Sequence, residues 1–160
     1  MDKKTRDNST MMNGLYWWGV PTLFRCPHKP ETKGCDIALV GVPQSTGNGT
    51  TQRDQHLGPR AVRNISAQGR RGHLRFGISP WEMCDIRDFG DVPLPEANNN
   101  EQCIERITEF YDVLAESSVR PISIGGDHSI TGGILQAIAG PKSKLTKGEK
   151  AVLVHFDAHT

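Results

Sequence analysis

Three short apolar runs, each ending beside glycine, proline or an ionisable residue, constrain most strongly what this chain can fold into. They occupy residues 36–43, 122–126 and 151–156. Continuous apolar runs of this length are typical of strands buried on both faces of a parallel sheet. The segment 130–139, between the second and third runs, has helical character. A strand–helix–strand order favours a right-handed crossover between parallel strands, so the sequence predicts an α/β fold.

Two further helices are predicted from their boundaries and periodicity. Residues 58–69 place Pro59 in a first turn and Gly69 at the stop, which predicts a helix of about ten residues. Residues 101–117 predict a longer helix that Asn100 can cap. Its apolar face is made by Ile104, Ile107, Tyr111 and Leu114, spaced three and four residues apart.

The rest of the chain is less regular. Residues 1–33 are predicted to form an N-terminal arm that packs on the body or on a neighbouring subunit, because Trp17 and Trp18 are costly to expose. Residues 34–160 then form one α/β unit. Glycine and proline punctuate residues 70–100, where we expect irregular structure with one strand near Met83–Arg87.

Composition excludes several classes of partner. Nineteen basic and eighteen acidic residues nearly cancel, so no global field favours nucleic acid or an anionic membrane. No apolar run approaches the roughly 20 residues of a membrane-spanning helix. The first twelve residues are polar where a secretory signal needs an apolar core, so we expect a cytoplasmic protein. A small molecule or another protein is the expected partner.

The cysteines are expected to be reduced and structural. Cys26, Cys35, Cys84 and Cys103 form no C-x-x-C pair, and a chain of this length does not need disulfides for its core. A zinc site of Cys26, His28 and Cys35 is an alternative, but its spacing matches no common zinc finger and it lacks a fourth ligand.

The chemistry is concentrated where the second and third runs end. Gly125 and Gly126 allow a sharp turn that brings His128 to the carboxyl end of its strand. If the third run is a neighbouring strand, Asp157 and His159 point to one side of it because they are two residues apart. Clustered ionisable groups after apolar strands need a partner. Two imidazoles and a carboxylate therefore predict a metal site.

These residues resemble a known family. "SIGGDHS" at 123–129, followed by "HFDAHT" at 155–160, resembles the ureohydrolases, which comprise arginases, agmatinases and related guanidino-compound hydrolases. Upstream, "GVPQSTGNGTTQRDQHLGPRAVR" at 41–63 resembles the loop after the first strand of that family. The resemblance covers residues 36–160 and corresponds to the N-terminal half of a family member.

The resemblance implies a three-layer α/β/α sandwich around a parallel sheet, assembled as a trimer or hexamer, with or without a related subunit. It implies two divalent cations, Mn²⁺ or Ni²⁺. His128 would ligate one, Asp157 would bridge both, and His159 would ligate the second. The family motif is D-A-H-x-D, and the sequence stops one residue before its last aspartate. The catalytic acid–base residues would also lie outside residues 1–160, so we expect this piece alone to be inactive.

The implied reaction is hydrolysis of a guanidino compound by a metal-bridging hydroxide, releasing urea or a substituted urea and ammonia or an amine. The loop 44–56 resembles that of enzymes acting on guanidine, guanidino acids or alkylguanidines, with agmatine as the alternative substrate. Candidate substrate contacts are Asp54, Gln55 and His56. Asp127 is expected to hold a metal-binding side chain in the correct orientation without binding the metal itself. Rival interpretations are a non-catalytic partner subunit and a metal-dependent deacetylase.

Overall fold

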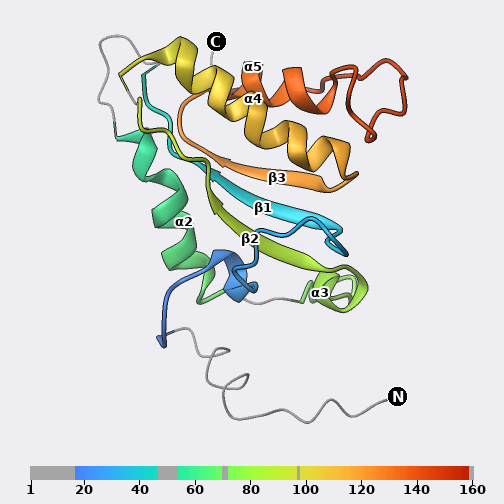
Figure 1. Ribbon diagram of the computed structural model, residues 1–160. Coiled ribbons are helices and arrows are strands. Elements are labelled where there is room, and N and C mark those ends of the chain that lie inside the picture. The colour runs from blue at the N-terminus through green and yellow to red at the C-terminus, as the bar shows by residue number, and fades with distance from the viewer. Residues whose placement is uncertain (1–16, 47–53, 70–71, 97, 159–160) are drawn as a thin grey trace.

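The computed structural model describes residues 17–46, 54–69, 72–96 and 98–158. A three-stranded parallel sheet lies at the centre, in the order β2-β1-β3 (Figure 1). The strands are β1 (Ile37–Val42), β2 (Ile86–Asp91) and β3 (Arg120–Gly125). The expectation of an α/β fold with a parallel sheet is confirmed.

The register of the sheet aligns the carboxyl ends of its strands. Val42 pairs with Gly125 across β1 and β3, and Gly41 pairs with Asp91 across β1 and β2. The loops that follow the three strands therefore open on one edge of the sheet. This is the edge at which open α/β sheets bind their ligands.

Two helices cover one face of the sheet. α4 (Asn100–Glu116) and α5 (Ile130–Ile138) lie side by side over it (Figure 1). The hydroxyls of Tyr111 in α4 and Ser123 in β3 are 2.6 Å apart. Burial raises the pKa of Tyr111 to about 12, although this hydrogen bond lowers it, so the phenol stays neutral. The core here includes Ala38, Val40, Val42, Phe89, Ile107, Tyr111, Leu114 and Ala137.

The other face is covered by shorter elements. α2 (Gly58–Ser66) follows a 3₁₀ turn, η2 (Gln55–Leu57), and packs with a second 3₁₀ turn, η1 (Leu23–Arg25). The short helix α3 (Pro80–Met83) contributes Trp81. Together they bury a second apolar cluster of Leu23, Cys26, Leu39 and Ile86, with Val62 and Ile124 packed against it.

One buried carboxylate joins three of these parts. Asp88 in β2 is 1% exposed. It accepts hydrogen bonds from the backbone N–H of Leu23 at 2.8 Å and of Gly90 at 2.8 Å. Arg63 of α2 donates to it through Nε at 3.0 Å and Nη2 at 3.1 Å, and its Nη1 reaches Asp91 at 2.6 Å. Arg63 therefore anchors α2 to β2.

Both helices predicted from their boundaries are present, with differences at their ends. The cap of α4 is Asn99, whose side chain accepts from the backbone N–H of Gln102 at 3.1 Å. Asn100 is instead the first helical residue. β2 begins three residues later than the strand expected at Met83–Arg87 because Pro80 starts the short helix α3 in front of it.

The predicted third strand was wrong. Residues 151–158 adopt no regular structure, and Val152 and Phe156 are 88% and 92% exposed. An apolar run becomes a strand only where a neighbour supplies ladder hydrogen bonds and cover, and the described part of the chain gives this run neither. Trp17 and Trp18 are also more than half exposed, so they are not buried against the body.

Among the described residues, no helix combines the length and apolar character needed to cross a membrane. None of the four cysteines forms a disulfide. Cys26 and Cys35 are buried. Cys26 accepts a hydrogen bond from Nε1 of Trp81 at 2.9 Å, and burial raises the pKa of Cys35. These contacts fit the expected structural role.

Replacing Arg63 with methionine should destabilise the protein by about 3 to 5 kcal/mol, because Asp88 would be left buried without its partner. Urea unfolding at pH 7 measures the change. Arg60→Met is the matched control, since Arg60 is exposed on the same helix, and it should change the free energy of unfolding by no more than about 0.5 kcal/mol. Equal effects of the two substitutions would contradict the anchoring role.

The destabilisation by Arg63→Met should shrink as the pH falls from 7 towards 4. Burial raises the pKa of Asp88, but hydrogen bonds from Arg63, Leu23 and Gly90 outweigh it and hold the pKa below the ordinary value. In the wild type, Asp88 stabilises the fold above the unfolded pKa of about 3.9 and this is lost at lower pH. Without Arg63, burial raises the pKa, so protonation favours the folded variant. Unfolding curves at several pH values test this sign.

Candidate metal centre

Two histidines and an aspartate come together beyond the carboxyl end of β3. His128, His155 and Asp157 each offer one ligand atom, and these atoms lie within 4.8 Å of one another. The ring centroids of His128 and His155 are 4.9 Å apart. Nε2 of His155 is 3.7 Å from Oδ2 of Asp157. All three side chains are exposed, so the cluster is open to solvent.

A glycine turn places His128 at this edge. Gly126 has φ +31°, and a Cβ there would collide with the carbonyl oxygens of Val42 and Gln44. Only glycine allows the backbone to approach the end of β1 so closely. The backbone N–H of the next residue, Asp127, donates to the carbonyl of Gln44 at 2.9 Å. The end of β1 thus fixes the turn that carries His128.

Asp127 braces the same turn from the other side. It is 5% exposed, and its carboxylate accepts from the backbone N–H of Ser129 at 2.9 Å and from the hydroxyl of that residue. These contacts hold the backbone on both sides of His128 at the start of α5. These backbone contacts give Asp127 a way to orient His128 without binding the metal itself, which is its expected role.

The other two members of the described cluster, His155 and Asp157, lie on the irregular segment at 151–158. Asp157, predicted from the sequence, is brought beside His128 without a strand. His159 lies outside the described residues. His155 was not assigned as a ligand from the sequence, although the spacing of two that links Asp157 to His159 also links Asp157 to His155. The motif "HFDAHT", which predicts the site, begins with His155.

The three residues that the sequence assigns to substrate binding are Asp54, Gln55 and His56. Asp54 precedes η2, Gln55 and His56 are its first two residues, and α2 follows. Nδ1 of His56 is 3.4 Å from Oγ of Ser45, so the two ends of the loop lie close together. α2 begins against β3, because a Cβ on Gly58 would lie 2.5 Å from the carbonyl oxygen of Gly125. The loop ends and the His128 turn therefore share one edge of the sheet.

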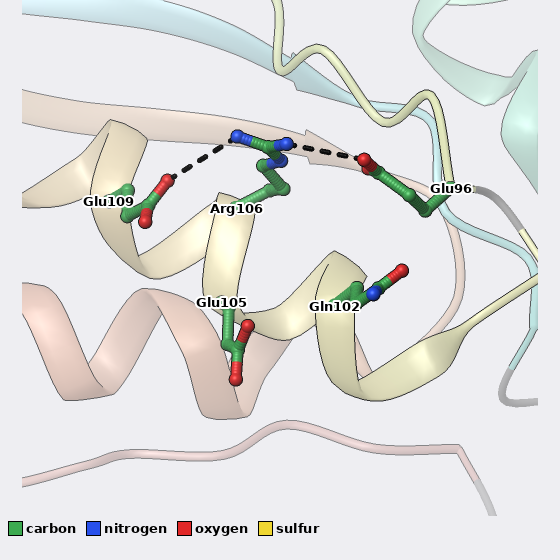
Figure 2. Close-up of a pocket in the computed structure, with 5 residues that line it drawn as sticks. All are labelled: Glu96, Gln102, Glu105, Arg106 and Glu109. Carbon is green, nitrogen blue, oxygen red and sulfur yellow. Dashed lines mark hydrogen bonds and ion pairs between the residues drawn. The ribbon is translucent and has the colours of Figure 1, made fainter.

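A second charged site lies along the outer side of α4. Figure 2 shows Glu96, Gln102, Glu105, Arg106 and Glu109 lining this pocket. Arg106 pairs with Glu96 at 3.2 Å and with Glu109 at 3.8 Å. Because Arg106 is about half exposed, these are surface ion pairs of small energetic weight. We interpret the pocket as a solvated helix face.

Known proteins resemble this chain in both sequence and fold. The Arginase family matches residues 35–160. Mitochondrial agmatinase of Gallus gallus is 37% identical over 142 residues, which cover 89% of this chain and 39% of the relative. Guanidinopropionase of Pseudomonas aeruginosa is 32% identical over 142 residues, covering 89% of this chain and 42% of the relative.

Solved structures agree. Proclavaminate amidino hydrolase from Streptomyces clavuligerus superposes with a TM-score of 0.73 at 27% identity, covering 78% of this chain and 40% of that one. Trypanosoma cruzi formiminoglutamase with Mn²⁺ has a TM-score of 0.57 at 19% identity, covering 74% and 41%, which shows a shared fold. The expected arginase-like fold is confirmed.

The chain spans about two-fifths of the length of the curated relatives it matches. Within that span the family match covers well over half of the 160 residues. It includes both motifs that supply the clustered side chains, the glycine turn with His128 and the segment with Asp157. The chain belongs to the arginase family.

Proposed function

We propose that the protein carrying this sequence is a metal-dependent hydrolase of guanidino compounds. The observation that carries the proposal is the convergence of His128, His155 and Asp157 at the carboxyl edge of a parallel sheet. Relatives named agmatinase and guanidinopropionase are 37% and 32% identical to this chain over 142 residues. The reaction cleaves a C–N bond of the guanidino group and gives urea or a substituted urea with ammonia or an amine.

The donor set suits two divalent cations with oxygen and nitrogen ligands. The cluster offers imidazole and carboxylate groups, whereas Cys26 and Cys35 are buried in the apolar clusters of the fold. This chemistry favours Mn²⁺ or Ni²⁺ over a thiolate zinc site. We propose Mn²⁺, held by His128, Asp157 and His159, with His155 beside them. When bound, such cations lower the pKa of a shared water and stabilise developing negative charge.

The residues of the chain itself orient these groups and the substrate. Asp127 and the glycine turn fix the direction of His128. Asp54, Gln55 and His56 are proposed to contact the substituent that the guanidino group carries, since their polar side chains can form hydrogen bonds with it. Their place at the end of the loop 44–56 supports this assignment.

For the substrate we propose guanidine, a guanidino acid or an alkylguanidine, with agmatine as the second candidate. The loop sequence "STGNGTTQRDQH" supports this order, and among the relatives the name guanidinopropionase denotes an enzyme of a guanidino acid. The non-catalytic subunit is less well supported, because a subunit without chemistry has no need of clustered ligands.

The proposed assembly is a trimer or hexamer, with or without a related subunit, in the cytoplasm. Trp17 and Trp18 support an assembly because they are 66% and 55% exposed in the single chain, and exposed aromatic clusters are typical of interfaces. We therefore propose that the N-terminal arm, residues 1–33, packs on a neighbouring subunit. Residues 34–160 form the α/β unit.

The complete protein loaded with Mn²⁺ should release urea or ammonia from at least one of guanidine, 3-guanidinopropionate, 4-guanidinobutyrate, methylguanidine and agmatine. A coupled assay measures each product, and parallel loading with Ni²⁺ tests the choice of metal. Protein treated with a chelator is the control and should be inactive. If the protein demonstrably holds metal and hydrolyses none of these compounds, the enzymatic function is wrong.

His128→Ala and Asp157→Asn should each weaken Mn²⁺ binding by the complete protein by at least about 100-fold, because each removes a ligand. His159→Ala should be equally damaging, whereas His155→Ala should cost about tenfold or less. Isothermal titration measures the affinities. His73→Ala is the control, since His73 stacks on Phe76 in a different loop. A loss for His155→Ala as large as that for His128→Ala would make His155 the third ligand.

A further inference from the structure

Gln44 is a buried carboxamide at the end of an apolar strand. It lies two residues beyond Val42 and is 1% exposed. Burying an amide is costly unless its polar atoms find partners. Nε2 of Gln44 donates to Oγ1 of Thr46 and, at 3.0 Å, to Oδ1 of Asn100. The thiol of Cys103 is a further partner of this side chain, so the amide is held from several sides.

The partners of the Gln44 side chain belong to two different segments. Thr46 lies at the start of the loop that ends with η2, and its hydroxyl also donates to Oδ1 of Asn100 at 2.9 Å. Asn100 is the first residue of α4. The three side chains form a closed triangle of hydrogen bonds. This triangle ties the start of the loop to the helix layer over the sheet.

The backbone of Gln44 holds the third segment. Its carbonyl accepts from the N–H of Asp127 at 2.9 Å, and Gly126 approaches it so closely that a Cβ there would collide with both its carbonyl and its N–H. Beyond Asp127 comes His128 of the metal centre. One residue thus contacts the loop through its side chain and the His128 turn through its backbone.

The loop is also fixed at its far end. Ser45 follows Gln44 directly, and its Oγ is 3.4 Å from Nδ1 of His56. The position of His56 relative to His128 therefore depends on how Gln44 and its neighbour are held. In the proposed reaction, His128 lies at the reacting end of the substrate and the loop residues at the substituent.

We propose that Gln44 is a positioning residue that sets the separation between the substrate loop and the His128 turn, and so selects guanidino substrates by the length of their substituent. This inference rests on the proposed function. Gln44 does not touch the reacting atoms in this role. A buried hydrogen-bonded amide suits it because its rigid geometry is lost when one partner is removed.

Gln44→Met in the complete protein keeps the volume of the side chain and removes its donors. We expect KM for the preferred substituted substrate to rise about tenfold. We expect kcat for unsubstituted guanidine, if guanidine is turned over, and the Mn²⁺ affinity to stay within about twofold. Equal losses for all substrates, or loss of metal, would overturn the inference, because a general structural role produces those results.

Gln102→Met is the matched control. It makes the same chemical change at an exposed position of α4, where Gln102 is one of the residues that line the outer pocket in Figure 2. Thr46→Val gives a second route if Gln44→Met folds poorly, since it removes at a half-buried position the hydroxyl that makes two of the three hydrogen bonds in the triangle. It should raise KM in the same direction. An unchanged KM in Thr46→Val and Gln44→Met alike would contradict the proposal.

Hydrogen exchange separates this inference from the proposed function. In Gln44→Met, amides of residues 54–57 and 127–131 should exchange about tenfold faster, while those of β2 stay protected. The control Gln102→Met should leave both regions unchanged. If the wild type holds metal but hydrolyses no guanidino compound, the proposed function fails. The exchange result alone then decides whether Gln44 couples the loop to the His128 turn. Unchanged exchange in Gln44→Met would then refute it.

Discussion

The buried carboxylate of Asp88 is the interaction on which one whole face of the sheet depends. It receives hydrogen bonds from Leu23 near the N-terminus, from Arg63 in α2 and from Gly90 beside it in the strand. A carboxylate this deeply buried is tolerated only with such partners. The network therefore joins three segments that the sequence separates by as many as 65 positions.

This network matters for the candidate site because the loop with the proposed substrate contacts leads directly into α2. α2 is held at one end by Arg63 and is pressed at its start against the carbonyl of Gly125. The loop in front of it and the His128 turn therefore meet at one edge. Gln44 links these two parts more directly than Asp88 does, since it contacts both. The stability of the fold and the geometry of the candidate site therefore depend on two different buried polar residues, Asp88 and Gln44.

The sequence predicted much of the fold because its signals are local. Apolar runs located β1 and β3, Pro59 located the start of α2, and the spacing of Ile107, Tyr111 and Leu114 gave α4 its buried face. The run at 151–156 failed because a strand depends on its neighbour. Asn99 replaced Asn100 as the cap because adjacent asparagines differ only in backbone geometry at that position.

By itself, the sequence determined the fold class, the two ligand motifs and the family, since strand runs, glycine turns and ionisable residues are readable without a partner. Only the tertiary structure decided which groups meet. It brought His155 into the cluster, paired Arg63 with Asp88 and buried Gln44 between the loop and the turn. The physical reason is that burial and pairing depend on residues distant along the chain, and no local pattern records them.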